Sequence, residues 1–146
     1  MAEQFSNKLA RAVGVVTTSS AGSIGALANT ITGISTGGVA VGDLVDNTNH
    51  IAGTKVTVVG VGQVTVDRAS TNTASATSQT VKFLTPTNVY SSPSATKSIL
   101  IGGTFSNLTN NDISVFVEVV DQSLATGPIG VSSVQLASDI PIPSGS

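Results

Sequence analysis

The chain has 146 residues with six basic and eight acidic side chains, a net charge of −2 and no cysteine. Because the six basic residues are scattered, no basic stripe can neutralise phosphates, and we expect no nucleic-acid partner. Without cysteine, zinc–thiolate sites, disulfides and thiol catalysis are excluded. No apolar run reaches the roughly 18 residues of a membrane span, so we expect no membrane partner either.

Composition predicts an all-β protein. Val, Ile and Thr account for 49 residues, and β-branched side chains fit a pleated strand better than a crowded helix. Hydrophobic residues make up 40% of the chain, enough for a core, whereas charged residues make up only 10%. Copies of so weakly charged a surface repel one another little, so we expect a homo-oligomer within a larger assembly.

Residues 1–29 are predicted to form an N-terminal anchor, a short helix or arm. Phe5 and Leu9 stand four residues apart and Gly14 follows as a stop signal, which predicts a helix over residues 2–13. A helix this short is marginal in water, so its apolar side must dock on the chain's own body or in a groove of another protein. The second alternative makes five residues candidates for partner binding: Phe5, Lys8, Leu9, Arg11 and Val13.

Residues 14–29 are rich in Ser, Ala and Gly, which predicts one short strand or an extended arm. Residues 30–84 follow as the first predicted β lobe, because short Val/Ile/Thr runs alternate there with Gly, Asn and Asp. In its clearest hairpin, a turn at residues 60–62 should place two valines from each arm on one face: Val56, Val58, Val64 and Val66. The predicted strands are Thr30–Ile34, Val39–Val45, Lys55–Val59, Gln63–Asp67 and Thr80–Phe83.

Residues 85–146 form the second predicted lobe, which is sandwich-like and antiparallel and begins with most of a Pro- and Ser-rich linker over residues 84–97. Its predicted strands are Ser98–Ile101, Ser114–Val120 and Val131–Leu136. The middle strand is apolar on both sides, so it should lie centrally in a sheet. Lobes of this size are marginal alone. We therefore expect that the lobes brace each other, that other chains brace them, or that the natural chain continues past Ser146.

Catalytic and metal-binding candidates are weak, and we expect no enzyme activity, cofactor or metal. Gly33 to Gly37 matches G-x-S-x-G, with Asp43 and His50 following, but another strand follows where a nucleophile elbow needs a helix. His50 is predicted to be an exposed loop residue. Asp43, Asp46, Asn47 and Asn49 offer oxygens without the calcium-loop spacing. Asn107-Leu108-Thr109 fits a glycosylation sequon, which matters only in a secreted eukaryotic protein.

Three motifs within residues 32–83 resemble a small β module of tailed-phage fibre and structural proteins. They are Gly-x-x-Val-Gly over residues 38–42, Ala-Gly-Thr-Lys-Val over residues 52–56 and Val-x-Val-x-x-Ala over residues 64–69. FSNKLARAVG (residues 5–14), ILIGGTFSNLTNNDISVFVEV (residues 99–119) and DIPIPSGS (residues 139–146) resemble a virion structural protein of tailed phages, particularly those of cyanobacteria.

The two resemblances imply a small module inserted between the start and the β-sandwich of a virion protein. In that family more strands follow the Pro-rich turn, so either the natural chain extends further or a neighbouring subunit completes the sheet. The resemblance implies a non-enzymatic subunit located in the virion, with capsid, neck or tail proteins as partners. It fits capsid decoration and a neck- or tail-attached collar or fibre equally. The alternative is a glycan- or surface-binding adhesion module, although the chain has no Trp and a single Tyr for stacking sugars.

Overall fold

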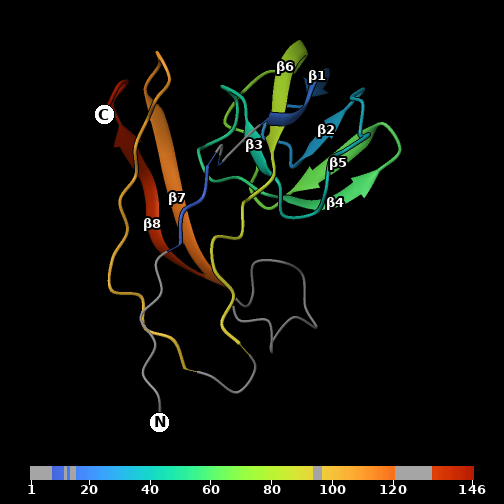
Figure 1. The fold of residues 1–146 in the computed structure, drawn as a ribbon. Coiled ribbons are helices and arrows are strands. Elements are labelled where there is room, and N and C mark those ends of the chain that lie inside the picture. The colour runs from blue at the N-terminus through green and yellow to red at the C-terminus, as the bar shows by residue number, and fades with distance from the viewer. Residues whose placement is uncertain (1–7, 12, 14–15, 94–96, 121–132) are drawn as a thin grey trace.

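The computed structural model describes residues 8–11, 13, 16–93, 97–120 and 133–146, and these residues form an all-β structure with two lobes and no helix (Figure 1). All strand pairs are antiparallel, as the sequence predicts. The strands are β1 (Val16–Ile24), β2 (Thr30–Thr32), β3 (Leu44–Asp46), β4 (Val56–Gly60), β5 (Gln63–Val66), β6 (Ala76–Leu84), β7 (Ile113–Val120) and β8 (Ser133–Ile142).

The first lobe is a six-stranded sheet that closes into a small barrel. Its strand order is β3-β6-β1-β2-β5-β4. The two outer strands meet through an antiparallel bridge between Leu44 and Lys55. Two backbone hydrogen bonds flank this bridge, from Val45 N to Thr54 O at 2.8 Å and from Val56 N to Asp43 O at 2.9 Å. This contact joins the two ends of the sheet and covers part of the edges that an open sheet would expose.

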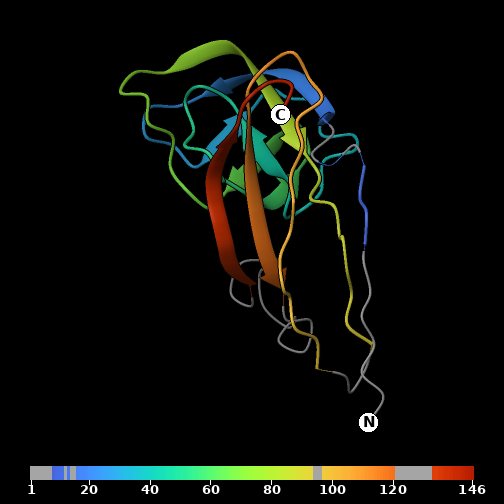
Figure 2. The same cartoon turned by 60° about the vertical axis from the view of Figure 1, so that its left-hand side comes forward.

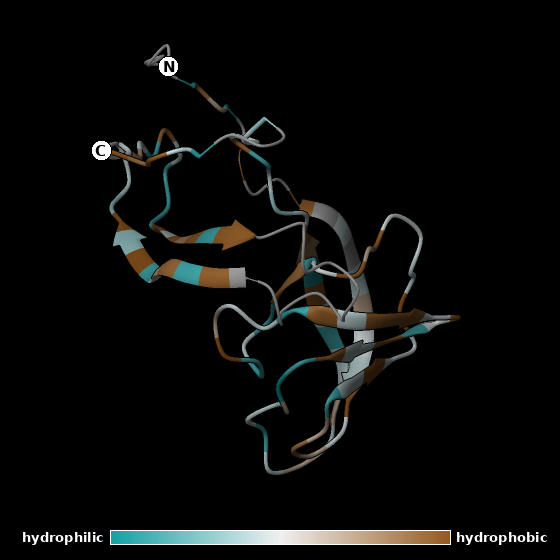
Figure 3. Cartoon of the chain, turned by 90° about the horizontal axis from the view of Figure 1, so that it is seen from below, coloured by the Kyte–Doolittle hydropathy of each residue, from teal (hydrophilic) through white to brown (hydrophobic). Residues whose placement is uncertain are grey.

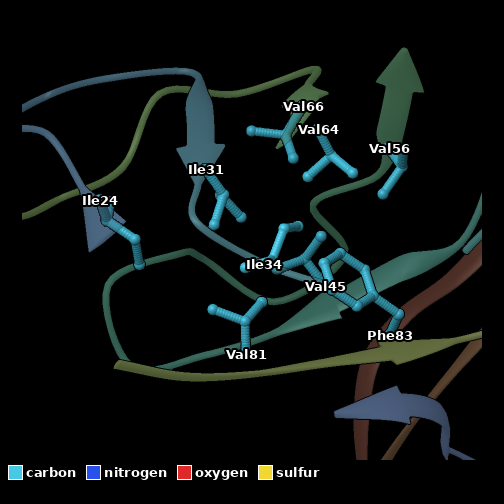
Figure 4. Packing of buried hydrophobic residues seen from close by; sticks show 9 residues of the cluster. All are labelled: Ile24, Ile31, Ile34, Val45, Val56, Val64, Val66, Val81 and Phe83. Carbon is cyan, nitrogen blue, oxygen red and sulfur yellow. The ribbon is translucent and has the colours of Figure 1, made fainter. Parts of the chain in front are cut away.

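Nine hydrophobic side chains fill the barrel interior and point toward one another (Figure 4). They are no more than 5% exposed and come from all six strands of the barrel and the loop after β2: Ile24, Ile31, Ile34, Val45, Val56, Val64, Val66, Val81 and Phe83. Gly22 on β1 leaves room for two of them, because a Cβ atom there would lie 2.5 Å from Ile34 Cγ2 and 3.2 Å from Ile31 Cγ2. Small and β-branched residues thus fill a narrow interior.

The β4–β5 hairpin forms where the sequence predicts it, with one correction. Val56 pairs with Val66 but Val58 pairs with Thr65, so Thr57 is an extra residue, a β-bulge. The bulge turns Val58 outward, where it is 55% exposed, and Val59 takes the inward position beside the core. The expectation of four valines on one face is therefore wrong for Val58.

The N-terminal segment also differs from expectation. Residues 8–11 and 13 are not helical, and the rest of the predicted helix, with Phe5, lies outside the described residues. Leu9 is 80% exposed, so no packing stabilises a short helix here. Within residues 14–29, where the sequence predicts one short strand or an extended arm, Val16–Ile24 forms strand β1 between β6 and β2 in the barrel.

The second lobe is a long two-stranded ribbon, β7–β8, beside the barrel (Figures 1 and 2). The predicted strand Ser114–Val120 forms as part of β7, but β8 is its one neighbour among the described strands, so it is not central. Ser98–Ile101 forms no strand and is exposed. β8 is longer than predicted, and Val131 and Ser132 of the predicted strand lie outside the described residues.

Candidate functional site

The described residues of the predicted N-terminal anchor are exposed. Leu9 is 80% exposed and Val13 is 58% exposed. Lys8 and Arg11 also lie at the surface. The rest of the described chain therefore leaves both apolar side chains of this segment uncovered.

Ser35, Asp43 and His50 do not form a catalytic relay. The Ser35 backbone N donates to Ser20 Oγ at 2.8 Å, and the Ser35 residue is exposed. Asp43 is buried, and its Oδ2 accepts a hydrogen bond from Ala40 N at 2.9 Å. Neither ring nitrogen of His50 has a hydrogen-bond partner. In a catalytic triad the carboxylate orients the imidazole, and the imidazole hydrogen-bonds to the hydroxyl. Neither contact is made by His50.

His50 is buried, contrary to the exposed loop residue that the sequence predicts, with 8% of its surface exposed. Its backbone N donates to Asn47 O at 3.1 Å, and Thr71 N donates to Asn49 O at 2.8 Å, which holds the turn against a neighbouring loop. Burial lowers the pKa of His50 from its usual 6.5, because the charged ring would lose its hydration. His50 is therefore a neutral, structural histidine.

The Asp and Asn side chains of this loop make local contacts. Asp46 Oδ2 lies 3.4 Å from Lys82 Nζ, an exposed ion pair between β3 and β6. Asn47 Nδ2 donates to Thr80 O at 2.7 Å, and Asn47 Oδ1 accepts from Asn49 N at 2.8 Å. In the part of the chain that the structure describes, no group of three His, Cys, Asp or Glu residues could hold a metal ion.

Next to this loop, polar side chains line an open depression of about 530 Å³ over β3 and β6. Amides, hydroxyls and one ion pair could all hydrogen-bond to a polar ligand. Among the described residues, no aromatic side chain lines it. The lining residues are Asp46, Asn47, Thr48, Ser78, Gln79, Thr80 and Lys82.

Asn107, which begins the sequon, is a structural clamp. It is 1% exposed, and its Nδ2 donates to Asn111 O at 2.8 Å and to Ile142 O and Pro143 O at 3.1 Å each. Its Oδ1 accepts from Thr109 N at 3.0 Å. One amide thus ties the turn before β7 to the end of β8. The Asx-rich run of residues 107–112 signals such a turn, but its long-range partners cannot be read from the sequence.

The described residues of the second lobe form no hydrophobic core of their own. Over residues 97–120 and 134–146, Asn107 alone is buried. Eleven large hydrophobic side chains in these ranges are at least 38% exposed: Ile99, Leu100, Ile101, Phe105, Leu108, Ile113, Val119, Val120, Val134, Leu136 and Ile140. Figure 3 shows the hydrophobic residues of the β7–β8 ribbon as brown bands.

One face of the ribbon is apolar throughout. Residues directly opposite each other in an antiparallel pair lie on the same face. Alternate residues of β7 meet apolar partners on β8, and each pair joins two hydrophobic side chains: Ile113–Ile142, Val115–Ile140, Val117–Ala137 and Val119–Val134. None of these eight is buried. This apolar face is the candidate interface.

The opposite face of the ribbon contacts the barrel. Lys55 Nζ and Glu118 Oε2 form an ion pair, with 15% and 22% of the side chains exposed. Nearby, Gly53 has a φ of 82°, and a Cβ atom there would lie 3.0 Å from Phe116 Cε1. The loop before β4 thus holds β7 by one ion pair and one close contact, and the apolar face points to the other side.

A scan against protein-family models, a search of curated proteins and a search of solved structures each find no match to this chain. In the described residues, no helix is long and apolar enough to cross a membrane.

Proposed function

We propose that this chain is a non-enzymatic structural subunit of a tailed-phage virion, an outer accessory protein on the capsid or at the neck or tail. The contrast between its two lobes carries the proposal. The barrel encloses nine buried hydrophobic side chains, whereas residues 97–120 and 133–146 bury none. A two-stranded ribbon is marginal alone in water, so an uncovered apolar ribbon beside a complete barrel suits a subunit that other chains cover.

The particle itself is inferred from the sequence resemblance to virion structural proteins of tailed phages, which spans both ends of the chain. Attachment through the N-terminal segment is supported by Leu9 and Val13, which are left exposed. The weak surface charge also favours dense packing of many subunits, because copies repel one another little.

Substitution of Leu9 tests the attachment. In particles purified by density gradient, the wild-type chain should co-sediment with the capsid. Leu9→Asp should reduce its occupancy by roughly tenfold to a hundredfold, because attachment would bury Leu9 and the variant would place an unpaired charge there. Val61→Asp is the matched control, because Val61 is fully exposed at the β4–β5 turn. Quantitative mass spectrometry measures the occupancy, and a wild-type chain missing from the particles would contradict the proposal.

The polar depression over β3 and β6 favours a second candidate, a glycan- or surface-binding adhesion module. Its amides and hydroxyls, including Asn47 and Gln79, are groups that bind sugar hydroxyls. A glycan array distinguishes the adhesion module from the structural subunit. The adhesion module should bind a glycan, and Asn47→Ala should lose that signal. The structural subunit should bind no glycan on the array.

A further inference from the structure

The turn at residues 47–50, which follows β3, forms one side of the polar depression. Two of its residues line the depression together with three residues of β6. Asn47 Nδ2 donates to Thr80 O at 2.7 Å, and Asn49 Nδ2 donates to Gln79 Oε1 at 3.3 Å. The shape of the depression therefore depends on whether this turn stays against β6.

The same turn is also held by hydrogen bonds that lie outside the strand ladders. His50 N donates to Asn47 O at 3.1 Å, and Thr71 donates to Asn49 O twice, from N at 2.8 Å and from Oγ1 at 3.2 Å. Segments fixed by hydrogen bonds of this kind can open locally while the strands beside them stay paired. The turn can therefore leave β6 without unfolding the barrel.

The position of the His50 ring suits only its neutral form. Both ring nitrogens are buried without a hydrogen-bond partner, so a proton there would place a charge away from water. Six charged side chains lie on the segments around the turn, and none of them hydrogen-bonds to the ring. Each of the three carboxylates among them already has another partner, a basic side chain or a backbone N–H. The six are Asp43, Asp46, Lys55, Asp67, Arg68 and Lys82.

We propose that the turn at residues 47–50 opens in acid and reshapes the depression, because protonation of His50 moves its ring from the interior into water. An exposed imidazole titrates near pH 6.5, whereas burial lowers the pKa of His50 in the closed turn. Each pH unit below 6.5 therefore favours the open turn further, until the buried ring titrates as well. A ligand held by Asn47 and Gln79 would bind at neutral pH and be released in acid.

This inference goes beyond the proposed virion role, which does not use the depression. To the second candidate, the adhesion module, it adds a control by pH. Its test needs no ligand, because the opening is a property of the turn itself.

Hydrogen exchange detected by NMR at pH 7.5 and 5.5 tests the opening in the full chain. Thr71 N donates to Asn49 O, so its amide exchanges when the turn opens. Its protection factor, corrected for the intrinsic exchange rate at each pH, should fall by up to roughly tenfold in the wild type. Val66 N donates to Asn29 O and belongs to the buried core, so its amide reports unfolding of the barrel. Dilute urea should accelerate exchange at Val66 more than at Thr71, because a local opening exposes little surface.

Two variants remove the titrating group. His50→Gln keeps a polar side chain, and His50→Phe keeps a ring without losing a hydrogen bond, because the imidazole nitrogens make none. In either variant the Thr71 protection factor should be the same at both pH values. A wild-type protection factor that does not fall, an equal fall in the variants, or a urea dependence at Thr71 as steep as at Val66 would overturn the proposal. None of these outcomes bears on the virion role, which is scored on particles.

Discussion

At the scale of single residues, one amide organises the second lobe. Asn107 is its only buried side chain among the described residues, and Nδ2 contacts three backbone carbonyls. The hydrogen bonds of Asn107 thus hold the ends of β7 and β8 together, whereas a hydrophobic core holds the barrel together. This matters because an unpaired buried polar group costs more than a hydrogen bond contributes.

Asn107→Asp should release the ends of β7 and β8. The variant keeps the side-chain shape but replaces the donating amide by an oxygen that faces the carbonyls of Asn111, Ile142 and Pro143. We expect a loss of about 2–3 kcal/mol in the protection of β7 amides, with the barrel amides unchanged. Hydrogen exchange followed by mass spectrometry measures both lobes at once. Asn88→Asp is the control, because Asn88 is exposed and bonds only to Ser91 Oγ. Unchanged protection in Asn107→Asp would contradict the clamp.

Burial of His50 should make the stability of the barrel depend on pH. Its folded pKa is lowered by burial, so between pH 6.5 and that lower pKa the unfolded chain binds a proton that the folded chain does not. The free energy of unfolding should therefore fall as the pH falls through this window, by at most about 1.4 kcal/mol per pH unit. Urea titrations between pH 7.5 and 5.5 should show this slope in the wild type and a flatter one in His50→Gln. Equal slopes would show that another group is responsible.

At the scale of elements, a glycine contact joins the loop before β4 to β7. Gly53→Ala should cost more stability than Gly33→Ala. Both glycines have positive φ, 82° and 71°, so both substitutions carry a backbone cost of about 1 kcal/mol. Only at Gly53 does the new Cβ atom lie 3.0 Å from Phe116, whereas nothing lies within 4 Å at Gly33. The difference between the two urea midpoints measures how firmly the ribbon packs on the barrel, and equal midpoints would mean that it does not.

Local patterns predicted several elements well. The β4–β5 hairpin, β2 and β7 lie within two residues of their predicted bounds, because alternating valines and a Gly-rich turn determine short-range pairing. Other elements depend on distant partners. The bulge at Thr57 and the burial of His50 arise from tertiary pairing, which no window of sequence contains. Ser98–Ile101 has a strand pattern without a partner strand in the described chain.

The candidate site was predicted only in part. The two apolar faces of Ser114–Val120 indicated a strand that needs neighbours on both sides, and the structure provides one. The apolar pairs across β7 and β8 could not be predicted, because the register shifts twice along the ribbon. The N-terminal candidates Lys8, Leu9, Arg11 and Val13 are exposed, and their role as an anchor stays a prediction.

At the scale of the whole molecule, a closed barrel is joined to an open two-stranded ribbon. The barrel joins its outer strands and has a full core, so it can keep its shape alone. Among the described residues, β7 has β8 as its one strand partner, and none of the side chains on the apolar face of the ribbon is buried. This division suits a subunit whose ribbon is covered by neighbouring chains of an assembly and whose barrel projects from that assembly.

Localised reconstruction of intact phage particles by electron cryo-microscopy tests the assembly role most directly. We expect density for this chain at repeated positions on the capsid, neck or tail, with the apolar face of β7–β8 covered by neighbouring chains. A particle that lacks this chain, or one in which the apolar face of β7–β8 stands uncovered in solvent, would contradict the account.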